Sequence, residues 1–325
     1  ISDATRKQLA DLAQSLEGGA APLSVQVSPE ILDGLVRLTQ PVDIDLLARL
    51  QTAFANHDLL RAPFVPFSPS SAKRASRAND FQRLSKLGDE IIELRNGKKS
   101  LSPNVWFSNV LADADGADLL SGFSVHTVVL TPEAAAKIGT LDNYAKPYRI
   151  SSDVAVRTTD PVFAKTLSSN QINPVITAYS LAAELLVQRQ EVIDGGGILS
   201  SNFVILTTTS GAPINTALLG PLAVAIDRAP QLRLRALSSL PRANSEATLV
   251  KVPRSDEVDV SVAGKTIDAL ADELASTSLM LPPDAPQHAA WTTSRLAMLD
   301  DRLSSDDFAL RLKGFRNQLR LLRAS

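Results

Sequence analysis

Alternating helix-like and strand-like patterns in residues 173–239 constrain the fold more than any other feature. A helix is predicted over 174–190, where apolar side chains recur at helical spacing. The apolar run 203–206 follows and is typical of a strand that is covered on both faces. A second helix over 215–228 and a second strand over 232–237 repeat the unit. The segment therefore predicts an α/β fold with a mainly parallel sheet.

The chain before this segment repeats the same alternation. Residues 62–67 contain two prolines, so we expect this strand to be irregular. Residues 148–157 alternate in polarity, which suits an exposed or edge strand. An acidic connection is expected around Asp113, and a long helix is expected over 72–95. Further strands are predicted at 23–27, 104–108 and 125–130, and further helices at 2–16, 29–38 and 41–56.

The pattern changes after Pro241. Residues 246–259 are polar and are expected to form a connection. Three helices are predicted after it, at 266–279, 289–303 and 306–323. The basic residues of the last helix are expected to form a solvated face. We therefore predict two parts, a (β/α) domain over 1–245 and a C-terminal helical subdomain over 246–325.

Composition excludes several classes of function. The 33 basic and 35 acidic residues nearly cancel, so no strong field would draw the chain to nucleic acid. Cysteine is absent, which excludes disulfides and thiolate metal sites. No apolar run is long enough to predict a membrane span. Because the chain starts at Ile1, we expect a processed or partial product, whose signal or anchor would lie outside these residues.

Four motifs carry a resemblance to known families through their order along the chain. They are residues 25–35 (VQVSPEILDGL), 62–66 (APFVP), 128–133 (VVLTPE) and 182–186 (AAELL). Seven strand-like segments followed by a helical bundle resemble the irregular seven-stranded barrel of family 57 glycoside hydrolases and polysaccharide deacetylases. The repeated succession of a strand and a proline-containing turn also resembles the pattern in the extracytoplasmic region of actinobacterial cell-envelope proteins of unknown function. The resemblance implies an irregular (β/α)7-type barrel followed by a helical bundle.

The histidines do not match the metal site of the deacetylase-like barrels. Those barrels hold a metal with histidines and carboxylates at strand ends. The three histidines of this chain are His57, His126 and His288, and no two of them have the spacing of a metal-binding pair. We therefore expect no metal and no cofactor.

Three carboxyl groups near strand ends are candidates for glycoside hydrolysis, which needs two carboxyls about 5 to 10 Å apart. They are Glu30, Glu133 and Asp153. Glu30 and Glu133 each follow a Ser-Pro or Thr-Pro pair, so each can instead be an acid that stabilises a helix N-terminus. Asp153 can simply face solvent. If two of these carboxyls catalyse hydrolysis, we expect them to be those of Glu133 and Asp153. Glu30 is a candidate for ligand binding.

Aromatic and hydroxyl side chains provide the other candidates for ligand binding. Trp106 at a strand end could stack on a sugar ring, or it could belong to the core. Thr209 and Ser210 follow an apolar strand-like run and could offer hydroxyl groups to a sugar or an anion. Alternatively, these hydroxyls only satisfy the turn.

Three functions are compatible with these patterns. The first is a non-catalytic or degenerate barrel of the bacterial cell envelope that binds a glycan or scaffolds an envelope or membrane protein. The second is an active carbohydrate hydrolase that uses strand-end carboxylates. The third is a structural domain without a ligand. The resemblance implies an extracytoplasmic location, with membrane anchoring through segments outside this chain.

Overall fold

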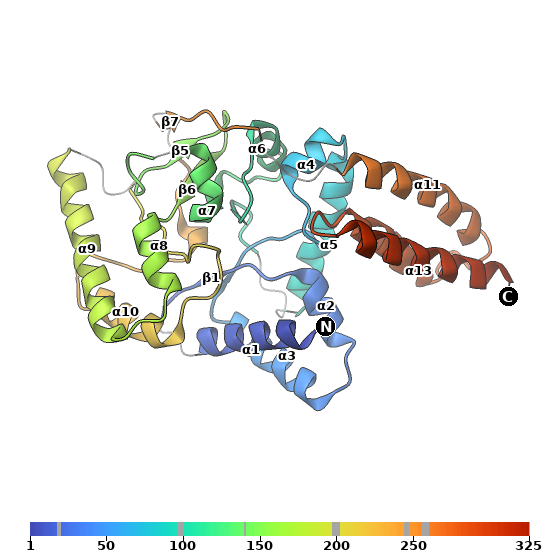
Figure 1. Ribbon diagram of the computed structural model, residues 1–325, viewed down its shortest axis with the longest axis horizontal. Helices are drawn as coiled ribbons and strands as arrows, with labels where there is room; N and C mark the ends of the chain where they lie inside the picture. Colours follow the sequence, from blue (N-terminus) through green and yellow to red (C-terminus); the bar gives the residue numbers. More distant parts are fainter. Residues whose placement is uncertain are drawn as a thin grey trace.

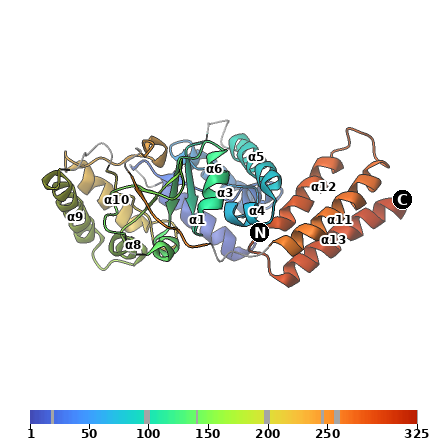
Figure 2. The same cartoon turned by 90° about the horizontal axis from the view of Figure 1, so that it is seen from above.

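The computed structural model describes residues 1–17, 21–95, 101–139, 141–196, 202–243, 247–254 and 260–324. The molecule is elongated, with strands and their covering helices at its centre and helices at both ends (Figures 1 and 2). The C-terminal helices project from one end as a bundle of three: α11 (Ser261–Ser278), α12 (Gln287–Leu296) and α13 (Ser305–Ala324). Helices α8 (Pro161–Ser168), α9 (Pro174–Asp194) and α10 (Thr216–Asp227) lie at the other end.

Proline or a capping side chain starts many of the remaining helices. Asp113, for example, accepts a hydrogen bond from the Gly116 N–H and so caps α6, where the sequence predicted only an acidic connection. The remaining helices are α1 (Asp3–Glu17), α2 (Pro29–Val36), α3 (Pro41–Phe54), α4 (Pro69–Arg74), α5 (Ala78–Arg95), α6 (Ala114–Ser121) and α7 (Pro132–Ala135).

The strands form two sheets, which an isolated bridge between Leu60 and Ser102 connects. Parallel pairing joins β1 (Ser24–Val25) to β2 (Asp58–Leu59). The larger sheet has the order β3-β4-β6-β5-β7, and β3, β4 and β6 are mutually parallel. Its strands are β3 (Val105–Ser108), β4 (Thr127–Leu130), β5 (Tyr148–Arg149), β6 (Ala155–Thr158) and β7 (Thr248–Leu249). The predicted α/β class with mainly parallel strands is confirmed.

Two predicted strands, 203–206 and 232–237, form no ladder with a neighbour, and Leu237 begins a short 3-10 helix, Leu237–Ser239. A few isolated hydrogen bonds hold them beside the sheet. The Phe203 N–H donates to the Ala145 carbonyl at 3.0 Å, and the Leu237 N–H donates to the Ser24 hydroxyl at 2.7 Å. The barrel is therefore irregular and open on this side.

Three other predictions are wrong in detail. Residues 62–67 are not a strand, because the chain leaves β2 and packs on α5, where Leu84 accepts a hydrogen bond from the Phe64 N–H at 2.9 Å. Residues 148–157 form a hairpin, and its second strand, β6, is buried between β4 and β5 rather than exposed at an edge. The helix predicted over 72–95 is two helices, which separate at Ser76, where φ is 58°.

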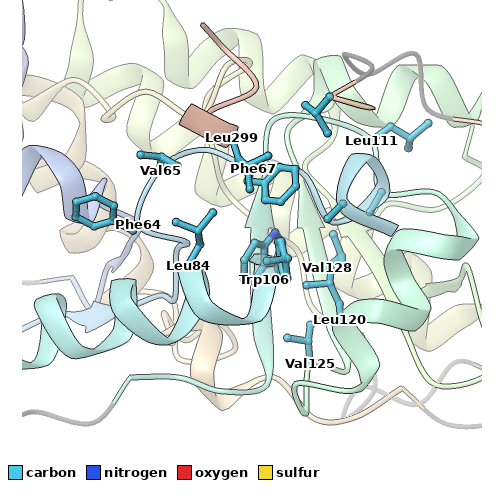
Figure 3. Close-up of a cluster of buried hydrophobic side chains, with 14 of the residues drawn as sticks. Phe64, Val65, Phe67, Leu84, Trp106, Leu111, Leu120, Val125, Val128 and Leu299 are labelled. Atoms are coloured by element: carbon cyan, nitrogen blue, oxygen red, sulfur yellow. The ribbon is translucent and has the colours of Figure 1, made fainter. Parts of the chain in front are cut away.

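One apolar cluster joins the sheet to the C-terminal helices. Trp106 and Val128 of the sheet belong to the same cluster as Ile267 and Phe315 of the helical bundle. Figure 3 shows its centre, where Trp106 lies among Phe67, Leu84 and Val128. The division into residues 1–245 and 246–325 stays a prediction. Of the helices that the structure describes, none combines the length and apolar character needed to cross a bilayer.

Candidate functional site

Side chains on the paired strands point alternately into the barrel and toward the surrounding helices. The register places Phe107, Val129 and Arg157 in one row across β3, β4 and β6. Phe107 and Val129 pack with Leu60 inside the barrel, whereas Val128 packs in the outer cluster. This alternation decides which residues can reach a ligand at the C-terminal ends of the strands, where α/β folds place their sites.

The next inward-facing row carries hydroxyl and amide groups. Asn109, Thr131 and Thr159 each lie two residues beyond the row of Phe107, Val129 and Arg157. The Thr159 hydroxyl accepts a hydrogen bond from the Thr207 N–H at 3.0 Å, and the Thr131 hydroxyl caps α7. Asn109 is exposed and lines a cavity. These three positions hold no carboxyl group.

The turn 207–213 lies over this row. Gly211 has φ of 81°, which favours glycine, and a Cβ atom there would lie 2.7 Å from Phe107 Cζ and 3.2 Å from Thr131 Cγ2. The Thr209 N–H donates a hydrogen bond to the Ser168 hydroxyl at 2.9 Å, and this bond connects the turn to α8. Ser210 is exposed and lines the cavity. Of the two predicted hydroxyls, only Ser210 is open to a ligand.

Trp106 belongs to the core. Its side chain is only 5% exposed, and its ring lies 5.7 Å from the ring of Phe81. Figure 3 shows it among apolar side chains on the outward face of β3. The prediction of sugar stacking does not fit this geometry, because alternation along the strand directs Trp106 away from the inside of the barrel.

The structure does not bring Glu133 and Asp153 together. Strands β4 and β6 are parallel with Leu130 opposite Thr158, so Glu133 follows the C-terminal end of the sheet whereas Asp153 precedes its N-terminal end. Asp153 forms an exposed ion pair with Arg242 at 3.0 Å. Glu133 is exposed in the first turn of α7, where its negative charge stabilises the N-terminus of the helix. The two carboxyls therefore cannot flank one glycosidic bond.

Glu30 lies where the barrel meets the C-terminal helices. Its side chain is 32% exposed and pairs with Arg311 of α13 at 3.4 Å. Burial raises the pKa of Glu30, nearby Asp300 adds to this, and Arg311 opposes it. The basic face of α13 is therefore only partly solvated, because Arg311 pairs with Glu30 and Arg316 pairs with Glu273. Local sequence patterns could not identify these partners.

Sequence reasoning missed Arg157, which points into the barrel from β6. It is 2% exposed, donates to the Ala145 carbonyl at 3.1 Å and lies 5.6 Å from the centre of the Phe203 ring. Burial lowers its pKa to about 10. A single arginine within the otherwise apolar and hydroxyl run 154–159 was the available signal.

The histidines lie in separate environments. The His57 Nε2–H donates to the Leu16 carbonyl at 3.0 Å, and its Nδ1 accepts from the Leu23 N–H at 3.4 Å. His288 Nε2 bonds to the Pro282 carbonyl at 2.9 Å. Across the described ranges, no three His, Cys, Asp or Glu side chains come close enough to hold a metal ion.

Comparisons with known proteins give a likeness of fold but not of sequence. No family model matches the chain, and no curated protein matches it. The alpha-amylase AmyC from Thermotoga maritima is similar over 99% of this chain and 89% of the enzyme, with a TM-score of 0.63 and 9% identity.

Two further solved structures are also similar. The GH57-type branching enzyme from Pyrococcus horikoshii matches over 98% of this chain and 81% of its own, with a TM-score of 0.53 and 10% identity. The 4-alpha-glucanotransferase from Thermococcus litoralis matches over 92% of this chain and 49% of its own, with a TM-score of 0.51 and 11% identity. The chain therefore has a GH57-like α/β fold, an irregular (β/α)7-type barrel with a helical C-terminal part.

Proposed function

We propose that this chain is a degenerate glycoside-hydrolase-like barrel that binds or scaffolds and does not cleave glycans. One observation carries the proposal: the row of Asn109, Thr131 and Thr159, just beyond the C-terminal ends of β3, β4 and β6, has hydroxyl and amide groups and no carboxyl. Glycoside hydrolysis requires two carboxyls about 5 to 10 Å apart across the bond. The turn at Gly211 also covers this row.

The proposed ligand is a cell-envelope glycan or an envelope protein. Exposed Asn109 and Ser210 supply an amide and a hydroxyl, which are groups suited to the hydroxyls of a sugar. The cell-envelope and extracytoplasmic assignment rests on the sequence resemblance. Fractionation of cells that produce the full-length protein tests it, and recovery of the protein in the cytosol alone would refute it.

A glycan-release assay tests the absence of catalysis. The wild-type chain is incubated with α-glucan and cell-wall glycan beside an active amylase, and we expect no product above the blank. Glu30→Gln, Glu133→Gln and Asp153→Asn serve as matched variants. Turnover by the wild type that any of these substitutions abolishes would establish the alternative, an active hydrolase that uses strand-end carboxylates.

Binding needs a separate measurement. We expect the chain to be retarded in gels that contain the glycan, and the double variant Asn109→Ala/Ser210→Ala to migrate faster. Ser152→Ala is the control, because Ser152 is exposed at the opposite end of the sheet. If the wild type is not retarded by either glycan, glycan binding by this rim is refuted.

A further inference from the structure

We infer that the chain binds an anionic amphiphile, a molecule with an apolar chain and a negatively charged head, in the cavity beside the barrel that Asn109 and Ser210 also line. The cavity has a volume of about 1200 Å³ and lies between the barrel and helices α1, α9 and α10. Small-molecule sites commonly measure about 300–1,000 Å³. The space is therefore large enough for an extended apolar molecule.

The open side of the barrel explains the cavity. The segments 203–206 and 232–237 run beside the sheet without ladder hydrogen bonds, and both line the cavity. Leu60 and Val129 reach it from inside the barrel. The cavity thus continues from the barrel interior, past the two unpaired segments, to the surrounding helices.

The helices supply an apolar wall. Leu12 of α1, Leu185 of α9, and Leu222 and Ile226 of α10 line the cavity. Apolar side chains, with a few polar groups that fix orientation, are typical of sites for apolar ligands. Burial of each methylene group of a ligand against such a wall favours binding.

All charged side chains that line the cavity are basic. Its charged residues are Arg189, Arg233, Arg235 and Arg302, and no carboxylate lines the cavity, although acidic residues slightly outnumber basic ones in the whole chain. The guanidinium groups of Arg189, Arg233 and Arg235 form no ion pair or hydrogen bond with the residues that the structure describes. Three arginines beside an apolar cavity favour an anionic head group.

The position of the charges agrees with an amphiphile. Arg233 and Arg235 are exposed and alternate with the half-buried Leu232 and Leu234. The charges therefore lie at the solvent side of the cavity, and the leucines lie deeper. The Ser28 hydroxyl also lines the cavity, is buried and has no hydrogen-bond partner among the described residues, which leaves it free to bond a ligand.

Calorimetric titration of the whole chain tests this inference. Laurate, myristate and palmitate are titrated below their micellar concentrations, with tetradecyltrimethylammonium as a cation of the same chain length as myristate. We expect one saturable site for the fatty acids, with affinity that rises roughly fourfold for each added methylene. The cation should bind at least roughly tenfold more weakly, because it meets arginines.

Two pairs of variants locate the site. Ala223→Phe should reduce fatty-acid binding, because Ala223 is 9% exposed and lines the cavity, whereas the control Val224→Phe changes a neighbour on α10 that is 47% exposed and outside the lining. Arg233→Gln/Arg235→Gln should weaken myristate binding by roughly tenfold through loss of charge-assisted hydrogen bonds. Arg320→Gln, exposed on α13, is its control.

Several results would overturn the inference. They are the absence of saturable myristate binding to the wild type, equal affinity for myristate and the cation, and equal effects of a variant and its control. If Ala223→Phe unfolds in circular dichroism, the exposed arginine variants and the chain-length series decide the question, because neither alters the core.

Discussion

The carboxylate of Asp58 accepts a hydrogen bond from the Ser102 hydroxyl at 2.6 Å and thereby joins β2 to the segment that leads into β3. The same carboxylate accepts a bond from the Ser24 hydroxyl at 2.8 Å and from the Ser238 N–H at 3.1 Å. One side chain therefore ties four segments together at the N-terminal end of the barrel, where the ladder hydrogen bonds between them are few.

Asp58→Ala should lower the free energy of unfolding by about 3 kcal/mol, because it removes several hydrogen bonds to a charged acceptor and leaves their donors unpaired. Urea denaturation followed by circular dichroism measures this loss. The control is Asp118→Ala, an exposed acid on α6, which should change the free energy by less than about 0.5 kcal/mol. Equal losses in the two variants would contradict the role of Asp58.

Gly88→Ala should destabilise the fold by about 3 kcal/mol, because its Cβ would lie 2.1 Å from the Ala62 carbonyl oxygen, so α5 would have to move. Gly314→Ala is the matched control. Gly314 is exposed on α13 with no atom within 4 Å of its Cβ position, so this change should stabilise the chain by about 0.7 kcal/mol. Thermal melts of both variants should shift in opposite directions.

Helices and the central strands could be predicted because their signals are local. The strand predicted over 104–108 became β3, and the helix predicted over 174–190 became α9, which Asn173 caps by accepting a bond from the Ile176 N–H. In both cases the periodicity and the terminating residues lie within the element itself.

Pairing and side-chain direction could not be predicted in the same way. Residues 203–206 are as apolar as β4, but a strand also needs a neighbour in register, and none of the described residues supplies one. Trp106 and Phe107 are neighbours on β3, but Phe107 faces the inside of the barrel and Trp106 faces the outer apolar cluster. A prediction that is wrong by one position therefore exchanges a core residue for a residue that faces the site. Glu30 pairs with Arg311, which lies far away in the sequence, so no local pattern indicates the contact.

Tyr148 should ionise at unusually high pH. Burial raises its pKa to about 12, and the hydrogen bond from its hydroxyl to the Asp142 carboxylate adds to this. A spectrophotometric titration by rapid pH jump, read at the tyrosinate absorbance before unfolding, should show a last step near 12 that Tyr148→Phe removes. Asp142→Asn should shift that step to lower pH. Completion of the wild-type titration by about pH 10.5 would contradict the assignment.

Glu30 should make stability depend on pH. Because burial raises its pKa in the folded chain above the ordinary value of 4.5, the folded state binds this proton more tightly than the unfolded state. The contribution of Glu30 to the free energy of unfolding is therefore fully present below pH 4.5 and is lost as the pH rises through the raised folded pKa. The difference between wild type and Glu30→Gln, measured by urea denaturation from pH 4 to pH 8, should fall over that window. Arg311→Gln should steepen the fall, since Arg311 lowers the pKa of Glu30, and a difference that rises with pH would refute this account.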